Sequence, residues 1–201
     1  MSGRSPRWIQ KIKNTNRVPI GYRKVEYIQS HGTEYIKTGF SPNQSSRVVC
    51  DFQYTSSEEE QTIFLSRTST SANQFGIFHN ASGWVFRYGT NAATNSSISI
   101  IARIAADIDR NTAKLNNVTM TALSNNFTSI ELMLFVRNTN GSLSNYAKAK
   151  LYRCKIYDGE TIIKDFVPCI RNSDNAAGLF DRVGGLFYEN AGTGAFSTPA
   201  A

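Results

Sequence analysis

Two groups of acidic residues could place carboxylates where they do chemistry. Glu58, Glu59 and Glu60 are consecutive, whereas a glycosidase needs two carboxyl groups on either side of one bond, roughly 5 to 9.5 Å apart. Consecutive side chains of a strand point to alternating faces, and in a loop the three carboxylates are solvated. We therefore predict that the protein has no catalytic residue and is not an enzyme.

Asp107 and Asp109 form the second group. They are two residues apart, so in a strand they share one face and are the candidate metal ligands, for a Ca²⁺ ion. Calcium takes about six to eight oxygen ligands, and the alternative is a pair of strand-end acids beside Arg110. We expect no bound metal and no other cofactor.

An aromatic stripe supplies a candidate ligand site. Trp84, Phe86 and Tyr88 alternate with Val85 and Arg87, which puts the three rings on one face of a strand. Ligand sites combine such rings with a few polar groups, and sugars suit them. The alternative is that Trp84 and Phe86 belong to the core of a sandwich, because the pattern does not show which face is covered. The predicted ligand-binding residues are Trp84, Tyr88, His79, Asn80 and Arg87.

Three cysteines, Cys50, Cys154 and Cys169, occur in a chain with two histidines. The odd number argues against a disulfide framework. Cys50 and Cys154 alternate with apolar residues, as small buried side chains do, and the histidines lack the spacing of a zinc site. We predict three free thiols.

The positive charge is concentrated at the start of the chain. The net charge is +7, and residues 1–24 hold seven basic residues and no acidic one, which leaves residues 25–201 formally neutral. Ser5 could cap a short helix with Pro6 at its first position, and Trp8 would lie on its apolar face. So short a helix needs a partner. We expect an anchoring arm, extended or short-helical, with the contact residues Arg4, Arg7, Trp8, Ile9, Lys11, Ile12 and Lys13.

This arm could contact an acidic protein surface or nucleic acid. Basic residues bind phosphates in a salt-dependent way, but the body has no basic surplus and no nucleic-acid-binding motif, so we favour docking onto a protein. No stretch approaches the roughly 18 to 20 apolar residues that span a membrane, and residues 1–13 lack the apolar segment of a signal peptide. We expect a protein made in the cytoplasm that binds neither nucleic acid nor membrane.

Many short strands are predicted between residues 25 and 190. Residues 47–54 alternate apolar and polar side chains with the period of two of a half-buried strand. Residues 97–103 and 129–137 are predicted as further strands. Frequent turn signals without a sustained helical period predict a sandwich or barrel.

A hairpin is predicted in the second half of the chain. Asp158-Gly159 is typical of a type I′ turn, which needs positive φ angles. Residues 161–167 are predicted to return as a strand that Pro168 stops.

Two stretches of the sequence carry a family resemblance. The first, from Gly21 to Phe40, contains GTEYIKTGF, and the second, from Ala149 to Gly194, contains KLYRCKIYDG, DFVPC and FYENAGTG. Together they resemble the concanavalin A-like (laminin-G-like) jelly-roll domains of phage and prophage tail or minor structural proteins from gut bacteria. The resemblance covers residues 18–196 and implies an all-β jelly-roll sandwich of two antiparallel sheets.

The same resemblance implies a virion structural protein. Residues 1–20 would anchor it to other capsid or tail proteins, and residues 21–201 would form the displayed, lectin-like domain, oligomeric in the particle and able to bind host surface glycans. A capsid decoration or head fibre and a tail component both remain open. The alternatives are a secreted or cell-surface lectin domain of a bacterium and a glycoside hydrolase of the same fold.

Overall fold

The computed structural model describes residues 18–200, and every regular element in this range is a β-strand. The strands are β1 Tyr22–Lys24, β2 Ile28–His31, β3 Ile36–Lys37, β4 Ser46–Tyr54, β5 Gln61–Arg67, β6 Gln74–Asn80, β7 Gly83–Gly89, β8 Asn91–Asn95, β9 Arg103–Asp109, β10 Thr112–Leu115, β11 Val118–Thr121, β12 Met133–Leu134, β13 Val136–Thr139, β14 Ser142–Ser144, β15 Lys148–Asp158, β16 Thr161–Arg171, β17 Ala177–Asp181 and β18 Leu186–Glu189. The predicted all-β jelly-roll sandwich is confirmed.

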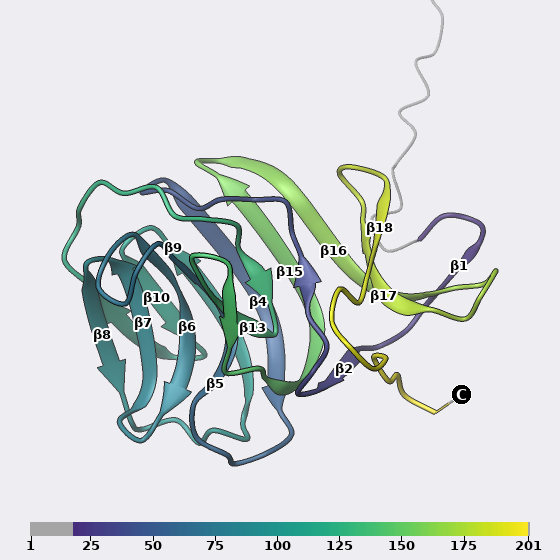
Figure 1. Ribbon diagram of the computed structural model, residues 1–201, viewed down its shortest axis with the longest axis horizontal. Coiled ribbons are helices and arrows are strands. Elements are labelled where there is room, and N and C mark those ends of the chain that lie inside the picture. Colours follow the sequence, from purple (N-terminus) through teal and green to yellow (C-terminus); the bar gives the residue numbers. More distant parts are fainter. Residues whose placement is uncertain (1–17, 201) are drawn as a thin grey trace, which may run out of the picture.

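Two sheets make up the sandwich. The larger has ten strands in the order β11-β10-β9-β4-β15-β16-β17-β18, with β1 on β16 and β2 on β15. The smaller has eight, in the order β14-β13-β5-β6-β7-β8, with β12 and β3 attached. The named strand pairs are antiparallel except β13 with β5, which is parallel. In Figure 1, β6, β7 and β8 lie on the left, β4 and β15 in the middle, and β16 to β18 on the right.

The core lies between the inner faces of these sheets. Strand β4 alternates fully between buried and partly exposed residues, which confirms the predicted half-buried strand. Its Phe52 is fully buried, as are Ile104 of β9 and Phe86 of β7. Burying each such side chain stabilises the fold by about 1.5–3 kcal/mol, so the facing rows hold the two sheets together.

The prediction of a strand over residues 97–103 was wrong. Strand β8 ends at Asn95 and strand β9 begins only at Arg103, with a turn between them. Ala102 N donates to Ser99 O at 3.1 Å and closes that turn. Ile98 is partly buried against the core. The apolar residues of the segment 97–103 therefore pack as a turn at the edge of the sandwich, although their pattern resembles that of a strand.

Residues 129–137 contain two short strands instead of one. Phe135 separates β12 from β13 and has a φ angle of 70°, in the left-handed region that side chains disfavour. Its ring is fully buried and its N–H donates to Ile63 O at 2.6 Å, which offsets the strain. After this kink β13 runs parallel to β5.

The hairpin between β15 and β16 is confirmed, but its turn differs from the predicted type. Gly159 has a φ of 56°, whereas Asp158 and Glu160 are not among the residues with positive φ. A type I′ turn needs two such residues and a type II′ turn only the first, so the pattern is that of type II′.

Pro168 does not stop the returning strand, contrary to the prediction. Strand β16 continues to Arg171. Proline has no N–H to give to the ladder, but the Pro168 carbonyl accepts from Val25 N at 3.1 Å. The strand therefore passes through this position.

Residues 1–17 lie outside the described residues, and with them the predicted contact residues of the arm. Strand β1 begins at Tyr22 and pairs with β16. Between residues 18 and 200 no helix is long and apolar enough to cross a membrane.

Candidate functional site

The aromatic stripe of β7 lies in the core. Trp84 and Tyr88 are 0% and 1% exposed. The Trp84 indole stacks on Tyr54, with ring centroids 5.3 Å apart, and its Nε1 donates to Ile98 O at 3.2 Å. Neither ring has a face free for a ligand. The alternative interpretation, that Trp84 and Phe86 are core residues, is the one that the structure shows.

The three polar residues predicted beside them are divided between different surroundings. His79 packs edge-on against Trp84, and its burial lowers the pKa of the imidazole. The Asn80 side-chain oxygen accepts from Ser82 N at 2.9 Å in the turn between β6 and β7. Arg87 points to the opposite, outer face of the sheet. The five predicted residues therefore do not form one site, and among them Arg87 alone reaches the outer-face cluster described below.

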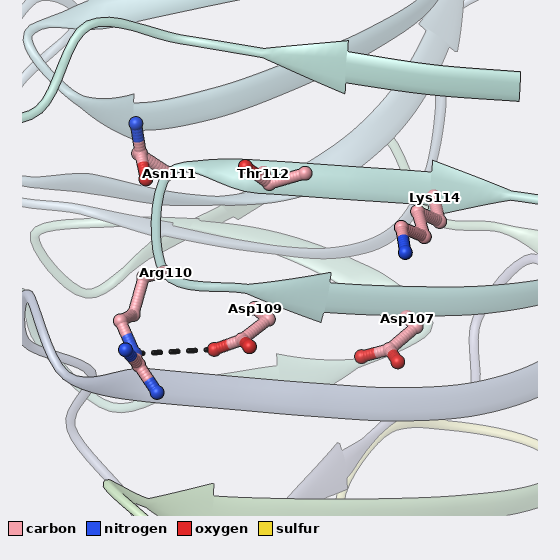
Figure 2. Close-up of a pocket in the computed structure, with 6 residues that line it drawn as sticks. All are labelled: Asp107, Asp109, Arg110, Asn111, Thr112 and Lys114. Carbon is pink, nitrogen blue, oxygen red and sulfur yellow. Dashed lines mark ion pairs between the residues drawn. The ribbon is translucent and has the colours of Figure 1, made fainter.

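Asp107 and Asp109 lie together at a pocket of about 330 Å³ on the larger sheet (Figure 2). Arg47 donates to both oxygens of Asp107, at 2.8 and 2.7 Å, and Asp109 pairs with Arg110 at 3.3 Å. Each carboxylate thus has a guanidinium partner. Within residues 18–200 no group of three or more His, Cys, Asp or Glu side chains could hold a metal ion.

Three arginines gather on the outer face of the smaller sheet. Arg67 ends β5, Arg87 lies in β7 and Arg137 in β13. The register places Arg137 beside Leu65, Leu65 beside Gly76, and Gly76 beside Arg87. Side chains at directly paired positions share a face, so two arginines occupy one row across four strands, with Leu65 and Gly76 between them. We call these three residues the arginine face.

A small apolar cluster forms the floor of the arginine face. Leu65, Phe78 and Val85 are 0%, 5% and 4% exposed and form a cluster apart from the main core. The Cζ atoms of Arg137 and Arg87 lie 4.8 and 6.0 Å from the centroid of the Phe78 ring. An aromatic ring attracts a cation placed within about 6 Å of it, so Phe78 positions both guanidinium groups.

Several polar groups on this face have no hydrogen-bond partner among the described residues. Arg137 is only 9% exposed, yet its Nε is unpartnered, as is the Nε of Arg87. Gln74 Oε1 and Thr62 Oγ1, on the same face by register, are also unpartnered and buried. Buried polar groups are nearly always hydrogen-bonded, so four unsatisfied groups on one face set this part of the sheet apart.

The arginine face also carries net positive charge, which Glu60 offsets only in part. Burial lowers the pKa of Arg67, and the charges of Arg137 and Arg87 lower it further. Burial likewise lowers the pKa of Arg137, while the nearby Glu60 carboxylate raises it and Arg87 lowers it. Arginine keeps its proton in proteins despite such shifts, so the electrostatic cost stays in the fold. A bound anion would remove that cost.

The sequence interpretation missed Arg67 and Arg137. The residues on either side of Arg137, Val136 and Asn138, are buried, and an arginine inside so apolar a segment is a signal that could have been noticed. The grouping of Arg137 with Arg67 and Arg87 could not have been predicted, because it depends on the register of β13, β5, β6 and β7.

The two stretches that carry the family resemblance meet in a loop pocket of about 430 Å³. Asn190 Oδ1 accepts from Tyr35 N at 3.1 Å and from Gly192 N at 2.8 Å. Buried Glu34 accepts from His31 N at 2.7 Å and from the Ser30 hydroxyl at 3.1 Å. Asn190 thus bonds the two stretches to each other, and Glu34 orders the turn between β2 and β3, so these motif residues have a structural role.

No family model matches the chain, and no curated protein matches it. Two solved structures of a carbohydrate-binding module, the Ruminococcus gnavus IT-sialidase CBM40, are similar in fold. The first has a TM-score of 0.49 at 12% identity and covers 68% of this chain and 91% of its own. The second, bound to alpha2,3 sialyllactose, has a TM-score of 0.46 at 13% identity, with 68% and 90% covered. Similarity at this level identifies no ligand for this chain.

Proposed function

We propose that this protein is a non-catalytic binding domain that takes an acidic glycan on the arginine face. The observation that carries the proposal is Arg137, which is 9% exposed, has an unpartnered Nε, and shares its face with two further arginines. The planar guanidinium group matches a carboxylate with two parallel hydrogen bonds. An anion beside these guanidinium groups would reduce the repulsion among the three cations.

The neutral groups of the same face support a saccharide over a simple inorganic anion. Gln74 Oε1 and Thr62 Oγ1 are unpartnered but buried, so a sugar hydroxyl would reach them only after the side chains above them move, whereas Thr139 is partly exposed. Thr139 adds a hydroxyl, to which Arg67 Nε already donates at 2.8 Å. A sugar that carries a carboxylate would use both kinds of group.

We further propose that the domain is of the concanavalin A-like kind and belongs to a phage particle. The resemblance of residues 18–196 supports this placement, and the basic residues of the N-terminal arm support attachment to other capsid or tail proteins. The arginine face would then be displayed to the host surface.

Calorimetric titration of the full-length protein with oligogalacturonate tests the binding function, with a neutral galacto-oligosaccharide and inorganic sulfate as comparison ligands. We expect binding of the acidic sugar alone. Arg87→Gln should weaken it about tenfold or more, since a charge-assisted hydrogen bond contributes on the order of 1.5–3 kcal/mol.

Arg110→Gln is the matched control, because it removes the same charge from the turn between β9 and β10, on the other sheet. It should leave the affinity unchanged. Binding of the neutral sugar with equal affinity, or equal loss in both variants, would contradict the proposal. Hydrolysis of the bound oligosaccharide would show that the domain is an enzyme.

A further inference from the structure

Glu60 stands directly beside the arginine face. It precedes β5, and its side chain is 55% exposed. One carboxylate oxygen, Oε2, accepts from Asn145 Nδ2 at 2.7 Å and lies 3.5 Å from Arg137 Nη2. Charge-assisted hydrogen bonds to guanidinium groups are normally about 2.7–2.9 Å long. The contact with Arg137 is therefore loose, and the contact with Asn145 is tight.

The backbone at Glu60 is held in an unfavourable conformation. Its φ angle is 63°, in the left-handed region that residues with a Cβ avoid. Asn145, at 53°, shares that region, and its carbonyl accepts from Thr62 N at 3.0 Å. Hydrogen bonds thus join these two left-handed residues, which lie on separate loops, to each other and to β5. They hold the Glu60 carboxylate next to Arg137. Strain of this kind gathers at functional sites.

We infer that Glu60 is a built-in competitor of the anionic ligand, whose carboxylate occupies part of the anion position at Arg137 and must be displaced before a ligand binds. The inference rests on the proposed function of the arginine face. A ligand carboxylate would accept from Arg137 with better geometry than Glu60 does. Since the Glu60 side chain is half exposed, it can turn into solvent without loss of core packing. The residue would thereby set the affinity of the site.

Another role for Glu60 makes an opposite prediction. If its carboxylate only neutralises Arg137 in the fold, its removal should destabilise the protein and leave ligand affinity unchanged or lower. The competitor role predicts tighter binding after the same change, because an uncharged side chain no longer occupies the anion position.

The test compares wild type with Glu60→Gln and Glu59→Gln in calorimetric titrations with oligogalacturonate. Glu60→Gln removes the charge and keeps an oxygen that can accept from Asn145. Glu59→Gln makes the same change in net charge one residue earlier, where no contact with Arg137 is seen among the described residues. We expect Glu60→Gln to lower the Kd about tenfold, which corresponds to 1.4 kcal/mol, and Glu59→Gln to change it less than about twofold.

Each outcome decides between the two proposals. If wild type binds and Arg87→Gln does not, but Glu60→Gln binds no tighter than Glu59→Gln, the competitor role is wrong and the binding function stands. Binding by Glu60→Gln alone would support a competitor that closes the site fully. If neither wild type nor Glu60→Gln binds, the proposed function fails. Glu60→Gly, which relieves the backbone strain, provides a second variant should Glu60→Gln fold poorly, and it should also bind more tightly.

Discussion

Arg137 lies over the ring of Phe78, with its Cζ 4.8 Å from the ring centroid, and both residues are more than nine-tenths buried. A buried guanidinium without full hydrogen bonding is costly, and the ring face offsets part of that cost. The same arrangement keeps the Arg137 group in one position on the outer face of the smaller sheet. The Phe78–Arg137 pair is therefore both a packing contact and the element that prepares the anion site.

Phe78→Ala should destabilise the protein by about 3–5 kcal/mol, the usual cost of removing a buried phenylalanine ring. Phe78→Leu keeps most of the apolar volume and should cost less than about 1.5 kcal/mol, yet it removes the ring face beneath Arg137. Urea unfolding gives the stabilities, and titration with oligogalacturonate should show weaker binding for Phe78→Leu. A leucine variant with unchanged affinity would show that the ring does not position Arg137.

Glu34 should make the stability of the fold depend on pH in the acid range. Burial by itself raises the pKa of this carboxyl, but hydrogen bonds from His31 N, Thr33 N and the Ser30 hydroxyl outweigh it and hold the pKa below the ordinary 4.5. A depressed folded-state pKa contributes stability that is present above about pH 4.5 and lost as the pH falls through the lower, folded-state value.

Glu34→Gln is the variant that checks this dependence. It should cost about 1.5–3 kcal/mol at neutral pH, the scale of hydrogen bonds to a charged group. The difference from wild type should shrink as the pH falls below about 4. Thermal unfolding followed between about pH 3 and pH 7 measures it. A constant difference across this range would contradict the assignment.

The three thiols should be unreactive in the folded protein. Cys50, Cys154 and Cys169 are free and buried. Burial raises the pKa of Cys169 to about 11 and the pKa values of Cys50 and Cys154 further. At about pH 8 a chromogenic thiol reagent should titrate no cysteine before unfolding and all three after it, since the thiolate is the reactive form. A disulfide between Cys154 and Cys169 in mass spectra would contradict this, because Cys154 lies opposite Phe166, three residues before Cys169 in β16.

Calcium should not stabilise the protein. Arg47 already donates to both oxygens of Asp107, and an ion would have to displace this guanidinium to reach a pair of carboxylates that offers too few ligands. The melting temperature should therefore agree within about 1 °C between millimolar Ca²⁺ and a chelator, because only a ligand bound to the folded state raises it. A clear rise that Asp107→Asn abolishes would restore the metal site.

Deletion of residues 1–17 should leave thermal unfolding of the domain nearly unchanged and, under the proposed placement in a phage particle, prevent incorporation into particles. The expectation follows from the separation of charge between the basic arm and the neutral body, and high salt should weaken the attachment of the intact protein. Particle incorporation is measured by the copy number in purified virions. Normal copy number without the arm would mean that the jelly roll makes the particle contact.

Local patterns were enough to predict the fold class and several strands. The alternation of residues 47–54 could only suit a strand with one covered face, and β4 is such a strand. Asp158-Gly159 likewise indicated the hairpin between β15 and β16, although one positive φ angle, at Gly159, produces a different turn type. These features depend on neighbours in sequence, where the alternation of side chains and the conformational freedom of glycine act directly.

Only the tertiary structure decided which faces are covered and which residues meet. The alternation of Trp84 and Tyr88 fits both an exposed sugar-binding surface and a buried core. The larger sheet covers their face, so they belong to the core. Arg87 and Arg137 come together because Phe135 kinks the chain and sets β13 parallel to β5, which no local pattern of side chains indicates. The sequence by itself determined an all-β chain with a basic start, because period and charge are local properties. The arginine face required the tertiary structure, because strand register is fixed by the packing of segments far apart in the chain.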